Sequence, residues 1–185
     1  MRAFIAVETG GPDIVGTGAS AAPDHLTLRF LGEIPETWVG RLTAALAPVA
    51  ATTPGFDFDL EGVGGFPSAR DPRVVWVGVT RGREPLELLA RRVAEAVTPI
   101  AGGPDRAEFV PHLTLFRVRG PADRDRARQL LEGSVPPPRP RTVAVREFLL
   151  KESRLERRGA QHRVVARFPL TGGPAATRPP GPTPP

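Results

Sequence analysis

The tetrapeptide His-Leu-Thr-Leu occurs twice in this chain, at residues 25–28 and again at residues 112–115. The whole sequence contains only three histidines, and two of them begin these copies. Successive side chains of a β-strand point to opposite faces, so in each copy the histidine and the threonine share one face and the two leucines share the other. Each copy therefore predicts a strand with an apolar face for a core and a second face that presents an imidazole beside a hydroxyl.

The hydrophobic pattern around the two copies predicts further strands and helices. Apolar residues recur at helical spacing over three segments, at about residues 38–50, 84–98 and 122–132. Alternating or continuous apolar runs predict strands, with the segment 73–80 in a central position because it is apolar throughout. These strands are expected at residues 2–8, 24–31, 55–61, 73–80, 108–118, 142–150 and 162–170. Each histidine strand is thus followed by a turn, a helix and another strand, which indicates two similar α+β halves that offer one histidine strand each to a shared cleft.

Four segments show no such pattern. Residues 9–23 are rich in glycine and small residues and are expected to form a flexible link without a helix. Residues 62–71 read as a Gly/Pro loop and residues 151–161 as a polar turn. Residues 172–185 are rich in proline and glycine, so we expect a disordered tail after a single domain that comprises residues 1–171.

Composition limits the possible classes of function. Without cysteine the chain has no disulfide, no thiolate nucleophile and no cysteine-based metal site. No apolar run approaches the length of a membrane span, and residues 1–8 are too short and too soon acidic for a signal peptide, so we expect a cytoplasmic protein. The net charge is +5, and Lys151 is the only lysine among the basic residues. That charge is compatible with an anionic substrate or nucleic acid, but a general composition bias towards Arg, Ala, Gly and Pro is the preferred explanation for the charge alone.

A pair of His-x-Thr strands suits chemistry at phosphorus. Histidine has an unperturbed pKa of about 6.5, so one imidazole can accept a proton and another can donate one near neutral pH. The threonine hydroxyl on the same face is a neutral donor that could hold a phosphoryl oxygen as its negative charge grows. Acyl transfer usually needs an activated nucleophile, and neither copy shows one. In-line displacement by water with an alkoxide leaving group fits these residues better.

At these positions the sequence resembles the two-histidine (2H) phosphoesterases, and within them the LigT-like RNA 2′,3′-cyclic phosphodiesterases, whose hallmark is a pair of His-x-Thr-x motifs. The flanking residues extend the resemblance over about residues 1–171. The matching blocks are residues 2–8, 25–32, 66–67, 72–79, 148–150, 153–155, 159 and 168–170.

The resemblance implies a bilobal α+β fold in which two pseudo-symmetric, mostly antiparallel sheets flanked by helices enclose a central cleft. It also implies hydrolysis of a 2′,3′-cyclic phosphate on RNA or a nucleotide to a 2′-phosphomonoester, without a metal or other cofactor. One of His25 and His112 would activate water and the other would protonate the departing O3′. Thr27 and Thr114 would hold the non-bridging oxygens, and Arg117 matches a family arginine near the phosphate. We expect a monomer with no membrane partner.

Three alternatives remain open at this stage. Some members of the family also join RNA ends as 2′-5′ ligases. The substrate could be a small cyclic nucleotide or a 2′-5′ oligonucleotide instead of RNA. The chain could also be an RNA-binding module that keeps the cleft but does no chemistry.

Four further residues are open to interpretation from the pattern alone. Arg29 is expected to share the strand face of His25 and Thr27. His162 stands where the family often has tyrosine, and we interpret it as a half-exposed strand residue in preference to an edge contact with the substrate. Trp38 and Trp76 lie on apolar stripes and are expected to pack in the core, although either could stack a base.

Overall fold

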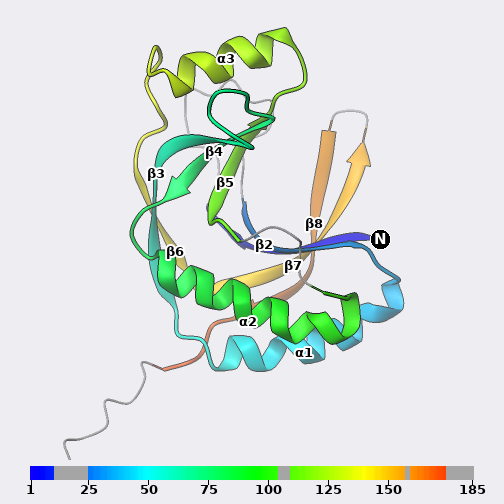
Figure 1. The fold of residues 1–185 in the computed structure, drawn as a ribbon. Helices are drawn as coiled ribbons and strands as arrows, with labels where there is room; N and C mark the ends of the chain where they lie inside the picture. The colour runs from blue at the N-terminus through cyan, green and yellow to red at the C-terminus, as the bar shows by residue number, and fades with distance from the viewer. Residues whose placement is uncertain (11–24, 104–108, 157–158, 174–185) are drawn as a thin grey trace, which may run out of the picture.

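The computed structural model describes residues 1–10, 25–103, 109–156 and 159–173. They form two four-stranded antiparallel sheets and three α-helices (Figure 1). In the first sheet the strand order is β2 (His25–Glu33), β1 (Arg2–Glu8), β7 (Glu147–Glu156) and β8 (Gly159–Pro169). In the second sheet it is β5 (His112–Arg117), β4 (Val74–Val79), β3 (Phe56–Phe66) and β6 (Arg141–Val145). The helices are α1 (Val39–Ala51), after a short 3-10 turn η1 (Glu36–Trp38), α2 (Arg83–Ala101) and α3 (Pro121–Leu131).

This architecture confirms the predicted α+β class with two antiparallel sheets and flanking helices. The expected central position of residues 73–80 is also confirmed, since β4 lies between β3 and β5. The sheets are not consecutive halves of the sequence, however. The first sheet takes β1 and β2 from the start of the chain and β7 and β8 from its end, and β7 pairs directly with β1 from Arg2↔Ser153 to Ala6↔Leu149.

One hydrophobic core joins one face of each sheet to the helices. The leucines of both tetrapeptides belong to it, as the alternation predicts. Helices α1 and α2 contact each other and cover this side of the molecule with their apolar stripes (Figure 1). Fully buried members include Ile5, Leu26, Leu42, Leu89, Leu113 and Leu150. The opposite face of each sheet therefore remains for the histidines and threonines.

Several expected boundaries are wrong, and packing explains them. The strand expected at residues 142–150 is divided at Arg146, because β6 pairs with β3 in the second sheet whereas β7 pairs with β1 in the first. The polar turn expected at residues 151–161 is mostly strand, since β7 and β8 pair with each other out to Glu156↔Gly159. The expected loop after residue 61 begins later, because β3 continues beside β4 to Phe66. Helix α2 runs three residues further than expected, and there Ile100 packs against the core.

Two expectations fall largely outside the described residues. The glycine-rich link was expected at residues 9–23, of which the structure describes only the first two. The tail was expected from residue 172, and residues 174–185 are not described. At its beginning the amide of Gly172 donates a hydrogen bond to the carbonyl of Thr53 (3.1 Å). None of the helices in the described ranges has the length and apolar character needed to cross a membrane.

Candidate active site

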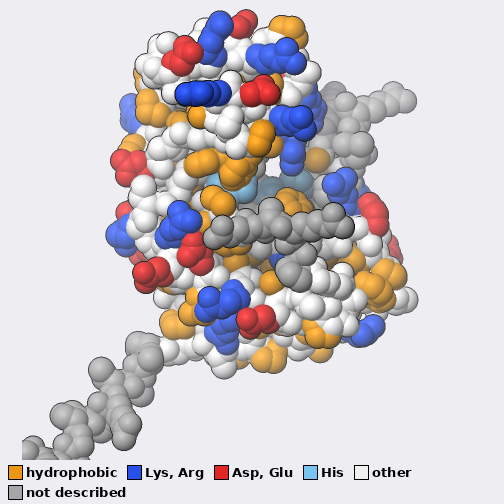
Figure 2. All heavy atoms as spheres, viewed as in Figure 1, with side chains coloured by type: hydrophobic (Ala, Val, Ile, Leu, Met, Phe, Trp, Pro, Cys, Tyr) orange, Lys and Arg blue, Asp and Glu red, His pale blue; other side chains and the backbone are white. Residues whose placement is uncertain are grey.

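The two histidine strands lie at adjoining edges of the two sheets. β2 is the edge strand of the first sheet, β5 is the edge strand of the second, and the two strands contact each other. Figure 2 shows histidine side chains together at the bottom of a hollow between the upper and lower parts of the molecule. The topology thus brings the repeated tetrapeptides together from distant parts of the sequence.

The first copy contains a one-residue irregularity that changes which side chains face the hollow. Along β1 and β2 the pairing runs Glu8↔His25 and Ala6↔Thr27, and then continues as Ile5↔Arg29, so that Leu28 has no partner. An extra residue of this kind is a β-bulge, and it reverses the alternation beyond it. Because paired residues share a face, Phe30, opposite Phe4, returns to the face of the histidine.

The second copy has the same irregularity at the same place. The pairing of β4 with β5 runs Gly78↔His112 and Trp76↔Thr114, and then Val75↔Phe116, so that Leu115 is skipped. Beyond the bulge Arg117 shares the face of the histidine and the threonine, opposite Val74. Simple alternation would place Arg117 on the core face, five residues after His112. The bulge is thus the reason that this predicted site residue lies on the same face as the other two.

Arg29 does not lie on the face predicted for it. The bulge at Leu28 turns its side chain to the other side of the sheet, where it is 6% exposed. Its guanidinium donates hydrogen bonds to the carbonyl oxygens of Gly102 and Gly103, just after α2. Arg29 therefore anchors the end of a helix and is not directed towards the hollow.

Aromatic rings surround His25. Its ring centroid lies 4.9 Å from that of Phe4 and 4.8 Å from that of His162, which meets it edge to face at 82°. The expectation that His162 is merely a half-exposed strand residue is incomplete, because this ring also contacts Phe4 at 5.1 Å. The only lysine lies on the same face, opposite Phe4 in the pairing, and its Nζ is 3.3 Å from a carboxylate oxygen of Glu8.

His112 is oriented by the backbone. Its Nδ1 lies 2.7 Å from the carbonyl oxygen of Val110. A carbonyl can only accept, so Nδ1 carries the proton and the neutral ring keeps Nε2 free to accept one. Burial lowers the pKa of His112, and the nearby positive charge of Arg117 lowers it further, while the hydrogen bond to Val110 works in the opposite direction. His112 therefore stays unprotonated to a lower pH than an ordinary histidine.

Trp76 was expected to pack in the core, and this expectation is wrong. It lies on the same strand face as His112, and its ring is 6.2 Å from that histidine and 5.2 Å from Phe66. The indole lies against Gly64 and Gly78, and a Cβ at Gly64 would overlap it. Two glycines in neighbouring strands thus allow a flat ring to form a wall beside His112. Trp38, in contrast, packs against the core as predicted.

We expect Arg117→Ala to raise the pKa of His112, because it removes a positive charge that disfavours the imidazolium. If His112 must be neutral to react, the acid limb of the kcat/KM profile will move to higher pH. The measurement is an NMR titration of the His112 ring, which is simple to assign with three histidines in the chain. The shift should shrink with added salt because Arg117 is exposed. Arg119→Ala is the control, and equal titration curves for both variants would contradict the assignment.

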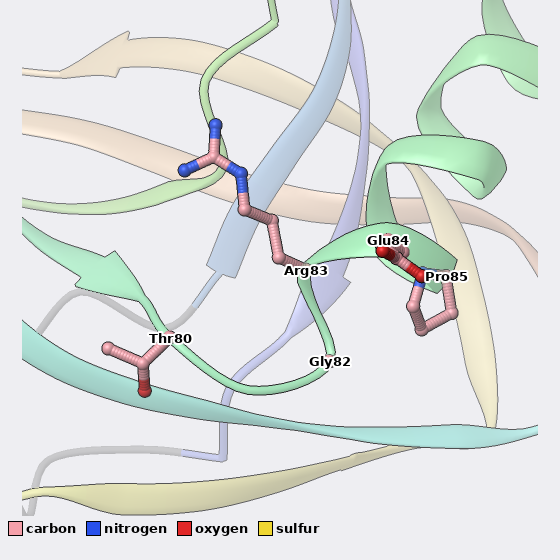
Figure 3. A pocket seen from close by; sticks show the side chains of 5 residues that line it. All are labelled: Thr80, Gly82, Arg83, Glu84 and Pro85. Atoms are coloured by element: carbon pink, nitrogen blue, oxygen red, sulfur yellow. The ribbon is translucent and has the colours of Figure 1, made fainter.

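A separate hollow lies at the turn between β4 and α2 and contains none of the predicted site residues. Its volume is about 390 Å³, and its walls are Thr80, Gly82, Arg83, Glu84 and Pro85 (Figure 3). Arg83 is already paired with Glu87 at 2.7 Å. Within the described parts of the chain, no three His, Cys, Asp or Glu side chains group closely enough to hold a metal ion.

Comparison with known proteins assigns the family. The model of the 2′-5′ RNA ligase superfamily matches residues 16–153, which is most of this chain. The chain belongs to that superfamily. A curated superfamily relative from Archaeoglobus fulgidus is 37% identical over 146 residues, covering 78% of each chain, and one from Aeropyrum pernix is 34% identical over 143 residues, covering 76% of this chain and 78% of the relative. Both are named RNA 2′,3′-cyclic phosphodiesterase.

Solved structures agree with this superfamily assignment. The protein TT0787 of Thermus thermophilus has a TM-score of 0.71 and 27% identity, with 93% of this chain and 99% of that chain covered. E. coli LigT complexed with 3′-AMP has a TM-score of 0.70 and 26% identity, with 92% and 98% covered. The resemblance drawn from the sequence is therefore confirmed at the level of superfamily and fold.

Proposed function

We propose that this protein hydrolyses 2′,3′-cyclic phosphate ends of RNA to 2′-phosphomonoesters by proton transfer between two histidines, without a metal. The observation that carries the proposal is the matched pair of His-x-Thr strands, each with a bulge after its threonine, at adjoining sheet edges. The names of the relatives from Archaeoglobus fulgidus and Aeropyrum pernix support the same reaction. One chain supplies both strands, so a monomer suffices, and an RNA substrate suits a cytoplasmic protein.

His112 is the general base of the proposed reaction. Its free Nε2 accepts a proton from water as the water oxygen bonds to phosphorus. The lowered pKa of His112 keeps that nitrogen unprotonated at neutral pH. His25 is the general acid, and it donates a proton to O3′ as the bond between O3′ and phosphorus breaks.

Thr27, Thr114 and Arg117 stabilise the negative charge that develops on the phosphoryl group between the attack of water and the departure of O3′. Negative charge grows on the non-bridging oxygens as water adds, and donors aimed at these oxygens lower the barrier. The threonine hydroxyls lie on the histidine faces of the two strands, and Arg117 joins the second face beyond the bulge. A guanidinium suits this place because its planar fork matches two phosphate oxygens.

Ligation is the second candidate, favoured by the name of the superfamily. The same groups would keep their roles, with His112 removing a proton from the 5′-hydroxyl that attacks the cyclic phosphate in place of water and His25 protonating the departing O3′. An assay with a cyclic phosphate end and a 5′-hydroxyl RNA separates the two. Hydrolysis alone in dilute RNA is the result that we expect.

Phe30 is the residue that we assign to contact with the terminal nucleoside. It lies on the histidine face, is 54% exposed, and its ring is 6.2 Å from Phe4. A base stacked on an aromatic ring gains about 1–3 kcal/mol. We expect Phe30→Ala to raise KM roughly tenfold with a smaller change in kcat, and Phe30→Tyr to remain close to the parent. Leu88→Ala, on α2, is the control because Leu88 is also an exposed large apolar residue. A drop in kcat with an unchanged KM would contradict this role.

The test of the proposed function is turnover of adenosine 2′,3′-cyclic phosphate, with and without EDTA. We expect turnover that survives EDTA, a bell-shaped pH profile and a 2′-phosphate product. An RNA-binding module without chemistry would bind the ends and release them unchanged. Comparison of rates on RNA ends, mononucleotides and 2′-5′ oligonucleotides distinguishes the substrate classes.

A further inference from the structure

Arginines gather where β5 leaves the second sheet and α3 begins. Residues 69–73 and 117–132 carry seven arginines and four carboxylates, an excess of three positive charges. The two segments are neighbours, because the amide of Val118 donates to the carbonyl of Arg73 (2.9 Å) and Val74 pairs with Arg117. We call Arg70, Arg73, Arg119 and Arg124 together the arginine surface.

The side chains of the arginine surface are available to a ligand. All four are exposed, and they form no ion pair or side-chain hydrogen bond with any other described residue. Two arginines next to other strands of the second sheet are paired with carboxylates, Arg81 with Asp59 at 2.7 Å and Arg146 with Asp57 at 3.0 Å. The contrast indicates that the four arginines of the arginine surface are not engaged in ion pairs that stabilise the fold.

A cavity of about 550 Å³ lies between the β3–β4 loop and α3. Arg70 and Arg124 belong to its wall, together with Arg128, which is already paired with Asp125 at 3.0 Å. Asp71, Asp125 and Glu132 also line the cavity, so its charge is balanced overall. Arg70 and Arg124 nevertheless keep free forks in this wall, and such forks match phosphate oxygens.

The arginine surface continues from the candidate active site. Arg117 shares a strand face with His112 and lies at the other end of β5, where the strand leads towards α3. Beyond it lie Arg119 and then Arg124. In Figure 2, Lys and Arg side chains on the upper part of the molecule reach down to the rim of the hollow that holds the histidines. A polyanion with one charge per nucleotide would meet successive arginines along this path.

We propose that the arginine surface binds the sugar-phosphate backbone of single-stranded RNA whose cyclic phosphate end lies at His25 and His112. This inference rests on the proposed function for the position of the reacting end. It makes RNA chains, and not mononucleotides, the preferred substrates. Contacts to phosphates alone carry no sequence information, so recognition by this surface is independent of sequence.

The experiment compares two double variants on two substrates. Arg70→Glu/Arg124→Glu reverses charge on the arginine surface. Arg41→Glu/Arg91→Glu makes the same change in net charge at exposed arginines of α1 and α2. The substrates are adenosine 2′,3′-cyclic phosphate and an oligoribonucleotide of about eight nucleotides with the same end. We expect the first variant to raise KM for the oligonucleotide roughly tenfold and to leave the mononucleotide within about twofold, while the second changes neither.

A binding measurement makes the result independent of catalysis. Fluorescence anisotropy with an unreactive oligonucleotide that ends in a 3′-hydroxyl gives the affinity at several salt concentrations. Loss of two phosphate contacts should reduce the slope of log K against log salt by about 1.4. Equal affinities and equal salt slopes for the two double variants would contradict RNA binding by the arginine surface, whatever their activities. A second outcome separates the two proposals. If Arg70→Glu/Arg124→Glu loses oligonucleotide binding but the parent protein turns over no cyclic phosphate, RNA binding by the arginine surface is supported and the proposed function is refuted.

Discussion

Replacement of His112 by alanine is expected to lower kcat for cyclic phosphate hydrolysis by about 10²–10⁴-fold, the usual contribution of one positioned acid or base. His25→Ala should cost a similar factor. The two changes should differ in their pH profiles. Without His112 the acid limb disappears, since the proton acceptor is gone, whereas without His25 the alkaline limb disappears.

Stability provides the control for these variants. His112 makes one hydrogen bond, to Val110, and is only half-buried, so the fold should survive its removal. His112→Gln and His112→Ala should unfold at similar temperatures and be similarly inactive. Activity within tenfold of the parent in a folded His112→Ala or His25→Ala variant would refute the two-histidine mechanism.

Thr27→Val and Thr114→Val should each lower kcat by about 10²–10³-fold, comparable to the loss of one donor in an oxyanion site. Valine has the shape of threonine but no hydroxyl, so the change removes only the proposed hydrogen bond to a phosphoryl oxygen. KM should change little if that bond strengthens in the transition state. Folding should be preserved, because valine favours strands.

Thr142→Val is the matched control for both threonine variants. Thr142 lies on β6, at the edge of the second sheet opposite β5, and its hydroxyl donates to Asp59 (2.6 Å). Its loss should leave kcat unchanged. If Thr142→Val and Thr114→Val reduce kcat equally, the threonines affect activity only by stabilising the sheets, and the proposed hydrogen bond to the phosphate is contradicted.

Much of the fold could be predicted because burial follows the two periods of secondary structure. The leucines of both tetrapeptides enter the core, and the three helices form where apolar residues recur at helical spacing. Which strands pair could not be predicted in this way. Nothing local to residues 142–150 indicates that the chain crosses from one sheet to the other at Arg146, since that depends on the distant partners β3 and β1.

The candidate site was predictable to the level of the repeated tetrapeptide and no further. The bulges at Leu28 and Leu115 arise from pairing with β1 and β4, so strict alternation misplaced Arg29 and offered no reason to expect Phe30 or Arg117 beside the histidines. Comparison of the two copies of the tetrapeptide gives a partial indication of these positions. Phe and Arg occupy the two positions after each copy, in opposite order. In both copies the second of these two residues faces the hollow.

Trp76 shows a second limit of predicting burial from the hydrophobic pattern. Its neighbours on β4 are apolar on both sides, which is typical of a core strand, yet the indole lies on the face of His112. The signal was available in the glycines at positions 64 and 78, which provide a flat surface beneath the ring. The contact between His162 and His25 had no comparable signal, because it depends on the pairing of β7 with both β1 and β8.

In the reaction that we propose, the paired His-x-Thr strands open a 2′,3′-cyclic phosphate and O3′ is the leaving group. The most direct test is to identify the product formed from an oligoribonucleotide with that end, in the presence of EDTA, by ³¹P NMR. We expect a single 2′-phosphomonoester that forms with the parent protein and not with His112→Ala. A 3′-phosphate product, or a 2′-phosphate product that forms equally fast with folded His112→Ala, would contradict the proposed reaction.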